Sequence, residues 1–292
     1  MRNQKNLLTA AIPVIALAFS YASGAGTAGM VFLKMGTGAR ELGMSGAVSA
    51  WIDDANAVYW NPAGLENMNL QQVSLMHTQW FEDIAYDNLS YAFPTMDTGT
   101  FGCSFSMLSM KSIQGYDWHG KKTELAGASN QLMMWSYANN LNRLLKIPAL
   151  FGEKNALLSG VTLKYAEERL GRNFATVTGL DFGFLCRDIT ENLNASLVYR
   201  NLSLSYKYYT KKETPPSDLV IGVSYRTGSS LLLAADMNFP SDVKSYAAAG
   251  IEYLFDVSNI QSAVRAGYRA DSGITFGFGV KKEEICFDYA FG

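Results

Sequence analysis

The chain has 292 residues, a formal net charge of -2 and 17% charged residues, against about a quarter in an average soluble domain. This balance argues against a basic phosphate-binding surface, so nucleic acid is not an expected partner. Three dispersed cysteines and two histidines fit neither a disulfide framework nor a metal centre. We therefore expect neither a metal nor a cofactor.

Residues 1–24 have the layout of a cleaved secretory signal peptide. Arg2 and Lys5 precede an apolar run, which is followed by small residues suited to cleavage. A G-x-G-x-x-G pattern comes directly after it, where a nucleotide-binding loop would need a preceding strand. We interpret this pattern as a flexible mature N-terminus; its glycines are Gly24, Gly26 and Gly29.

Downstream of residue 72 the apolar residues recur at every second position, which is typical of strands. In 273–281, for example, Ile274, Phe276 and Phe278 alternate with small and polar residues. Apolar residues outside and small or polar ones inside are typical of a membrane β-barrel, and a secreted β-sandwich is the alternative. Thirteen strands are predicted, near 73–80, 87–93, 100–109, 130–138, 157–166, 175–186, 193–200, 219–226, 231–239, 246–255, 262–269, 273–281 and 284–291.

An N-terminus in the periplasm would place the short turns on the periplasmic side and the long connections 110–128 and 201–217 outside. The exception is 139–156, a longer periplasmic connection with one helical turn. Thirteen strands leave an unpaired edge, which is not viable in lipid. We therefore expect about fourteen strands: either one lies in 25–52, or the chain ends before its last strand.

Residues 25–70 do not alternate, and they contain a segment with a different local pattern at 53–65. Asp53 or Asp54 is expected to cap a short helix that carries Tyr59. Pro62 disfavours a helical conformation at Asn61, and Gly64 is free to turn the chain.

About two helical turns are not stable alone in water. We therefore interpret 25–70 as a hatch inside the lumen of a barrel formed by 71–292. Arg40 is expected to anchor the hatch by pairing with Asp53 or Asp54. The alternative is a surface helix that leads into the barrel.

The N-terminal region resembles the PorV/PorQ family of outer-membrane proteins, which are FadL-like barrels. The family pattern runs F-L-x-x-G-x-G-A-R, then M-G-x-A, then D-D-x-x-A-x-Y-x-N-P-A-G-L. The C-terminal strands at 265–281 and 287–291 are similar to the family as well, although members usually continue into one further strand. The matching N-terminal positions are Phe32, Leu33, Gly36, Gly38, Ala39, Arg40, Asp53, Asp54, Ala57, Tyr59, Asn61, Pro62, Ala63, Gly64 and Leu65.

The resemblance implies an outer-membrane protein that binds proteins of type IX secretion, either shuttling cargo or anchoring a partner at the surface. The partners would be cargo C-terminal domains and translocon or attachment proteins, beside outer-membrane lipid. Aromatic residues in the long outer loops are candidate contacts: Tyr116, Trp118, His119, Tyr206, Tyr208 and Tyr209. The alternative is a FadL-like passive transporter of hydrophobic small molecules.

An enzyme is the least supported class, and we expect no catalytic residues. Two histidines, one in a predicted strand and one in a loop, do not make a serine–histidine–acid arrangement. Asp181, Arg265 and Asp288 lie on the predicted lumen face, where a structural charge network is the better interpretation.

Overall fold

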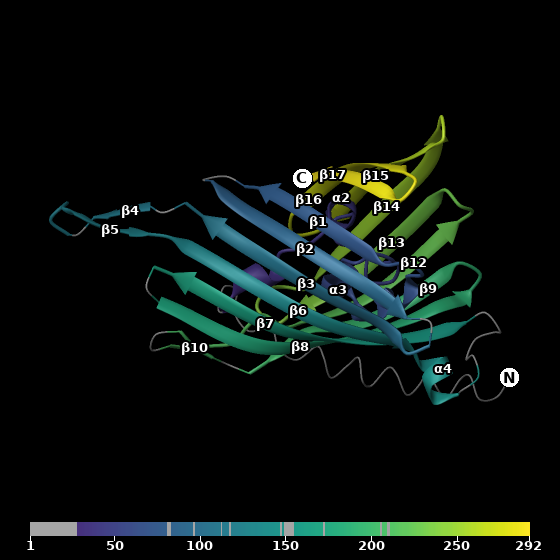
Figure 1. Cartoon of the computed structure of the whole chain (residues 1–292), viewed down its shortest axis with the longest axis horizontal. Helices are drawn as coiled ribbons and strands as arrows, with labels where there is room; N and C mark the ends of the chain where they lie inside the picture. Colours follow the sequence, from purple (N-terminus) through teal and green to yellow (C-terminus); the bar gives the residue numbers. More distant parts are fainter. Residues whose placement is uncertain are drawn as a thin grey trace.

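The computed structural model describes residues 28–80, 83–95, 97–111, 113–116, 118–146, 148, 155–171, 173–204, 206–208 and 211–292. The predicted signal peptide lies outside them. The main feature is one antiparallel sheet of thirteen strands (Figure 1). In spatial order these are β1 (Gln72–Gln79), β2 (Ile84–Thr95), β3 (Gly99–Met110), β6 (Ala128–Asn140), β7 (Ala156–Leu170), β8 (Asn173–Thr190), β9 (Leu193–Ser203), β12 (Asp218–Thr227), β13 (Leu231–Pro240), β14 (Tyr246–Val257), β15 (Ile260–Arg269), β16 (Gly273–Lys282) and β17 (Ile285–Phe291).

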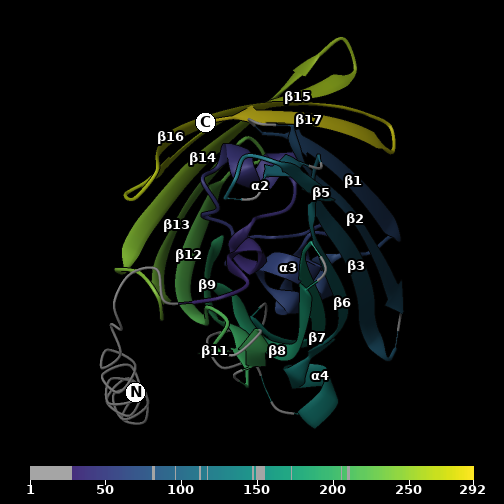
Figure 2. The ribbon, with the colours of Figure 1, turned by 90° about the vertical axis from the view of Figure 1, so that its left-hand side faces the viewer.

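The sheet curls into a barrel around a central segment of chain (Figure 2). The all-β prediction and its thirteen visible strands are confirmed. Strands β1 and β17 are the two ends of the sheet, and no ladder joins them within the described part of the chain. Residues 28–52 form helical turns and irregular chain, so the prediction of a fourteenth strand there is wrong for these residues.

Two short hairpins lie within the long connections that were predicted as loops. One pairs β4 (Ile113–Tyr116) with β5 (Lys122–Ala126), and Figure 1 shows it projecting beyond the barrel. The other pairs β10 (Tyr206–Tyr208) with β11 (Lys211–Glu213). At the opposite end of the barrel, α4 (Leu141–Leu145) supplies the helical turn predicted for 139–156.

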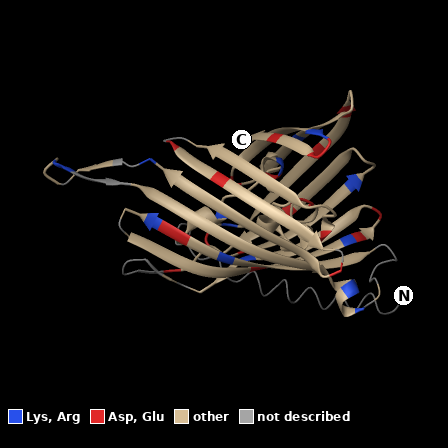
Figure 3. Cartoon of the chain, in the orientation of Figure 1, with Lys and Arg blue, Asp and Glu red and all other residues tan. Residues whose placement is uncertain are grey.

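The two faces of the sheet differ in the way that the alternation predicts. On β12, Val223 and Tyr225 are exposed, whereas Val220, Gly222 and Ser224, at the alternate positions, are buried. The outward side chains of the other strands are likewise large and apolar, and the strand surface that faces the viewer in Figure 3 is largely uncharged (Figure 3). Such an outer surface suits lipid better than water.

The centre of the barrel is filled by residues 28–70, which we call the inner segment. It contains the short helices η2 (Val31–Lys34), α2 (Ala39–Gly43), α3 (Ala57–Trp60) and η3 (Pro62–Asn67). Figure 2 shows α2 and α3 enclosed by the curved sheet. No helix in the described ranges is both long enough and apolar enough to cross a membrane.

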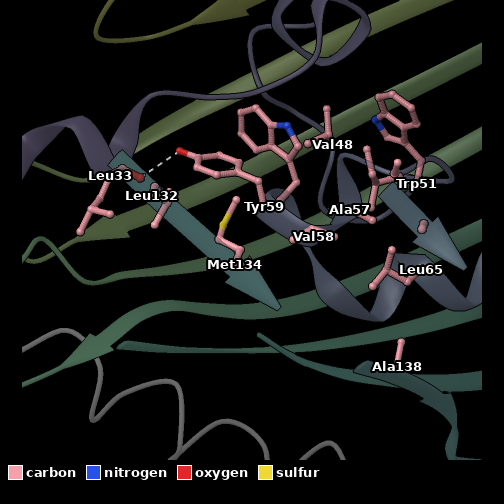
Figure 4. Close-up of a cluster of buried hydrophobic side chains, with 14 of the residues drawn as sticks. Leu33, Val48, Trp51, Ala57, Val58, Tyr59, Leu65, Leu132, Met134 and Ala138 are labelled. Carbon is pink, nitrogen blue, oxygen red and sulfur yellow. Dashed lines mark hydrogen bonds between the residues drawn. The ribbon is translucent and has the colours of Figure 1, made fainter. Parts of the chain in front are cut away.

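The largest hydrophobic core lies between the inner segment and the inner face of the sheet. Val58 and Leu65 of the inner segment pack in one cluster with Leu132, Met134 and Ala138 of β6 (Figure 4). This burial explains how helices of four to six residues persist, because tertiary packing supplies the stability that they lack alone. The alternative of a surface helix is therefore wrong.

Candidate functional site

The lumen is organised by the turn that leads into α3. Asp54 Oδ1 accepts a hydrogen bond from the Asn56 backbone N at 2.8 Å, and Asn56 occupies the N-cap position without capping through its side chain. The expected aspartate cap is thus wrong in detail: Asp54 supports the turn before the helix. Asn61 is extended, as predicted before proline, and its Nδ2 donates to the Ser49 carbonyl at 2.7 Å.

Pro62 and Gly64, which follow α3, have different structural roles. Pro62 ends α3 and begins η3, which the sequence did not predict. Gly64 lies inside η3, and a Cβ there would collide with Ile52 Cγ2 and approach the Ile52 carbonyl oxygen to 2.8 Å. Gly64 is therefore required by close packing inside the barrel, rather than by the predicted turn.

The aromatic pair of α3 ties the inner segment together. Tyr59 Oη donates to the Leu33 carbonyl at 3.1 Å, and Trp60 Nε1 donates to the Thr37 carbonyl at 2.7 Å (Figure 4). Burial raises the pKa of Tyr59 above its ordinary value. These bonds hold the start of the segment against α3 and define the shape of the space beside it.

A continuous chain of ion pairs joins the inner segment to the barrel wall. Arg40 Nη1 lies 2.6 Å from Asp53 Oδ1, as predicted, and Arg40 Nη2 lies 2.9 Å from Glu252 Oε1 on β14. Arg265 continues the chain, with Nε 2.7 Å from Glu252 Oε2 and Nη1 2.6 Å from Asp288 Oδ1. The predicted structural charge network at Arg265 and Asp288 is therefore present.

A second polar anchor lies on β13, the strand next to β14. Asp236 of β13 accepts hydrogen bonds from the backbone N of Val48 and of Ser49, both at 3.0 Å, and a third from Ser49 Oγ at 2.8 Å. Asp181, the third residue of the predicted network, pairs with Lys164 at 2.6 Å. Neither Asp236 nor Glu252 could be predicted as an anchor, because both are far in the chain from their partners.

Two acids of the inner segment face each other without a basic partner of their own. Burial raises the pKa of Glu41 well above its ordinary value, and the neighbouring Asp54 raises it further. Burial also raises the pKa of Asp54. The Glu41 side chain is fully buried. Its carboxyl lies within hydrogen-bond reach of the Asp54 carboxyl, and no nitrogen or hydroxyl group of another described residue donates to its oxygens.

Beside the inner segment runs a cavity of about 2300 Å³. Its lining includes Ser272 in the turn before β16 and Glu284 in the turn after it, so the cavity extends along the whole length of that strand. The lining combines charged groups such as Arg265 with apolar ones such as Leu33 and Met35. The cavity also reaches the seam between β1 and β17.

Only some of the aromatic residues predicted in the outer loops are exposed. Tyr116 and Trp118 lie at the projecting β4–β5 hairpin with 60% and 89% of their surface accessible. The rings of Trp118 and His119 are in contact, with centroids 3.5 Å apart and an angle of 38° between their planes. These three residues are therefore all exposed on the projecting hairpin.

The β10–β11 hairpin does not present Tyr206 on the surface, in contrast to the prediction. Tyr206 is only 8% exposed, and it packs in the core cluster together with Met30, so the expectation of an exposed side chain is wrong. Its Oη donates to Glu213 Oε2 at 3.2 Å. Tyr208 lies in strand β10, and Tyr209 lies outside the described residues.

Together, the fold and the lumen define a β-barrel with an internal plug. No group of three or more histidine, cysteine, aspartate or glutamate side chains in the described ranges has the arrangement of a metal centre.

Comparison with known proteins gives one family match and several solved structures of similar fold. A model of an uncharacterised protein family, UPF0164, matches residues 12–133. No curated protein matches the chain.

Solved structures that are similar to this chain include the toluene transporter TbuX of Ralstonia pickettii and the toluene transporter TodX of Pseudomonas putida. TbuX is 12% identical with a TM-score of 0.54, covering 89% of this chain and 93% of its own. TodX is 12% identical with a TM-score of 0.53, covering 85% and 89%. A mutant of TodX, described as a monoaromatic hydrocarbon channel, is 12% identical with a TM-score of 0.55 and covers 87% and 92%. At this identity the likeness establishes the shared fold.

Proposed function

We propose that the protein is an outer-membrane channel through which small, largely apolar solutes cross, with the inner segment acting as a hatch. The observation that carries this proposal is the cavity of about 2300 Å³ that runs beside the inner segment along the full length of β16. The structures of similar fold include toluene transporters, which supports the same class of solute.

The outer surface supports an outer-membrane location. Large apolar side chains cover the outward face of the strands, and the sheet curls so that most backbone groups pair between strands. Both features are what a bilayer demands of a spanning strand structure. The predicted signal peptide would supply the export that such a location requires.

The lining of the cavity favours solutes that carry some polar character. Leu33 and Met35 line the cavity together with the ion-paired Arg265 and Asp288. Because the charges in those pairs are mutually neutralised, they need not repel an apolar solute. The site therefore suits a small aromatic or amphipathic molecule better than a highly charged one.

The proposed function is tested in a Gram-negative host with the full chain in its outer membrane. An apolar fluorescent dye that an intact outer membrane excludes should enter faster than in cells with an unrelated closed barrel at equal abundance. Equal entry rates in both strains would reject the channel.

A second candidate is the protein-binding role in type IX secretion that the PorV/PorQ resemblance implies. The observation that favours it is the projecting β4–β5 hairpin with its exposed Trp118 and His119. Exposed aromatic residues on a projecting loop are common in recognition sites. A mild-detergent pull-down from the native membrane tests this role: secretion components or cargo C-terminal domains would support it, and repeated recovery of the barrel alone would reject it.

A further inference from the structure

The buried oxygen atoms of the inner segment that lack hydrogen-bond partners are concentrated in one place. Eight buried side-chain oxygens of the described residues lack a hydrogen-bond partner, although one of them, Asp181 Oδ2, is ion-paired with Lys164. Four of the eight belong to Thr37, Glu41 and Asn56. Glu41 and Thr37 have no exposed surface, and Asn56 is 4% exposed. Unsatisfied polar atoms in the interior are costly, so a cluster of them points to a ligand.

Two of these side chains, Glu41 and Asn56, lie against Gly38. A Cβ built on Gly38 would collide with Glu41 Oε2 and would lie 2.6 Å from Asn56 Nδ2. The carboxyl of Asp54 interacts with that of Glu41, and its Oδ1 also accepts from the Asn56 backbone N at 2.8 Å. Two carboxyl groups and one amide therefore belong to one small region of the segment, and Thr37 directly precedes Gly38 in the chain.

The nearest basic side chain is not available to neutralise this region. Arg40 follows Ala39 in α2, but its guanidinium is held by Asp53 at 2.6 Å and by Glu252 at 2.9 Å. Two ionised carboxylates at Glu41 and Asp54 would match the charge of one divalent cation. Oxygen donors of this mixture are those that a hard cation prefers.

We propose that Glu41 and Asp54, with the side-chain oxygens of Asn56 and Thr37, form a binding site for one calcium ion inside the barrel. Calcium tolerates an irregular set of carboxylate, amide and hydroxyl oxygens, whereas magnesium demands a near-octahedral site and keeps several of its waters. Gly38, Glu41, Asp54 and Asn56 all line the cavity, which gives the ion a path of entry.

The bound ion cross-links the two halves of the inner segment. Glu41 belongs to α2, and Asp54 and Asn56 belong to the turn before α3. Calcium thereby holds the segment in its folded form beside the passage. The site is independent of which solute, if any, uses the cavity.

Titration calorimetry of the full chain in detergent, after removal of cations with a chelator, tests the site. Calcium chloride should bind to one site per chain, and magnesium chloride should bind more weakly. Glu41→Gln should weaken calcium binding by about tenfold or more, because the charge count sets affinity in such sites. Glu191→Gln, in an exposed turn between β8 and β9, is the matched control and should bind as the wild type does.

Asp54→Asn is the second variant, and it should also weaken calcium binding. Both variants remove a buried charge while keeping side-chain shape, so the unligated barrels should unfold at or above the wild-type temperature. Absence of calcium binding to the wild type, or equal affinity in Glu41→Gln, would overturn the site. The two carboxyls would then share a proton instead.

Discussion

Arg40 of the inner segment and Glu252 of β14 meet in a two-point ion pair inside the barrel. Arg40 Nε donates to Glu252 Oε2 and Nη2 donates to Oε1, both at 2.9 Å. Planar two-point contacts between guanidinium and carboxylate are the strongest ion pairs available to side chains. The geometry fixes α2 against the wall, and the cavity lies beside it.

Arg40→Ala should therefore loosen the inner segment. The Glu252 carboxylate has no exposed surface and would lose one of its two arginines, so we expect a loss of about 3 kcal/mol in the free energy of unfolding. Urea unfolding in detergent measures it. Arg269→Ala removes an arginine whose pairing with Asp271 is much more exposed, and it should change stability by less than about 1 kcal/mol. Equal losses in the two variants would contradict the anchor.

Gly64→Ala should destabilise the protein through overpacking. The added methyl group collides with Ile52 in a site that has no free space, and we expect a cost of about 1–3 kcal/mol. The matched control is Gly179→Ala, whose Cβ would make ordinary contact with Ser203 Cβ at 3.4 Å. Thermal unfolding of the two variants compares them, and an unchanged Gly64→Ala protein would show that this packing is not tight.

Phe182→Arg tests whether the outward face of the sheet meets lipid. Phe182 is an outward, 38% exposed residue near the middle of β8, where an arginine in the bilayer costs about 2–4 kcal/mol. Folding into phospholipid vesicles should be impaired by that amount, while Phe182→Leu should fold almost as the wild type does. If arginine folds as well as leucine, this face does not lie in a membrane.

Trp118→Ala separates the two candidate functions. The side chain lies on the projecting hairpin, away from the residues that line the cavity. We expect weaker capture of protein partners and unchanged solute entry. Loss of solute entry with intact partner capture would contradict this assignment of the hairpin.

Much of this architecture could be predicted because β-strands carry their orientation in their own sequence. Alternation at positions such as Ile274, Phe276 and Phe278 is a local signal, and it gave both the strands and the side that faces outward. The pairing of Arg40 with Asp53 was also within reach, since the two are 13 residues apart and share one small segment.

The contacts between the inner segment and the wall could not be predicted in the same way. Glu252 is 212 residues from Arg40, and which strand faces α2 depends on how the whole sheet curls. Tyr206 was expected to be exposed because it lies in a long connection, but the hairpin packs into the core beside the start of the inner segment. The cluster at Glu41 forms because the inner segment folds back on itself, and this folding leaves no periodic pattern of apolar residues in the sequence.

The most direct test of the central claim is the rate of dye entry into host cells that carry a blocked cavity. Ser74 is a half-buried residue of β1 that lines the cavity, so Ser74→Trp should reduce dye entry several-fold at equal amounts of folded protein. Val223→Trp adds the same bulk to the outward face of β12 and should leave entry at the wild-type rate. Wild-type entry in Ser74→Trp cells would contradict passage through this cavity.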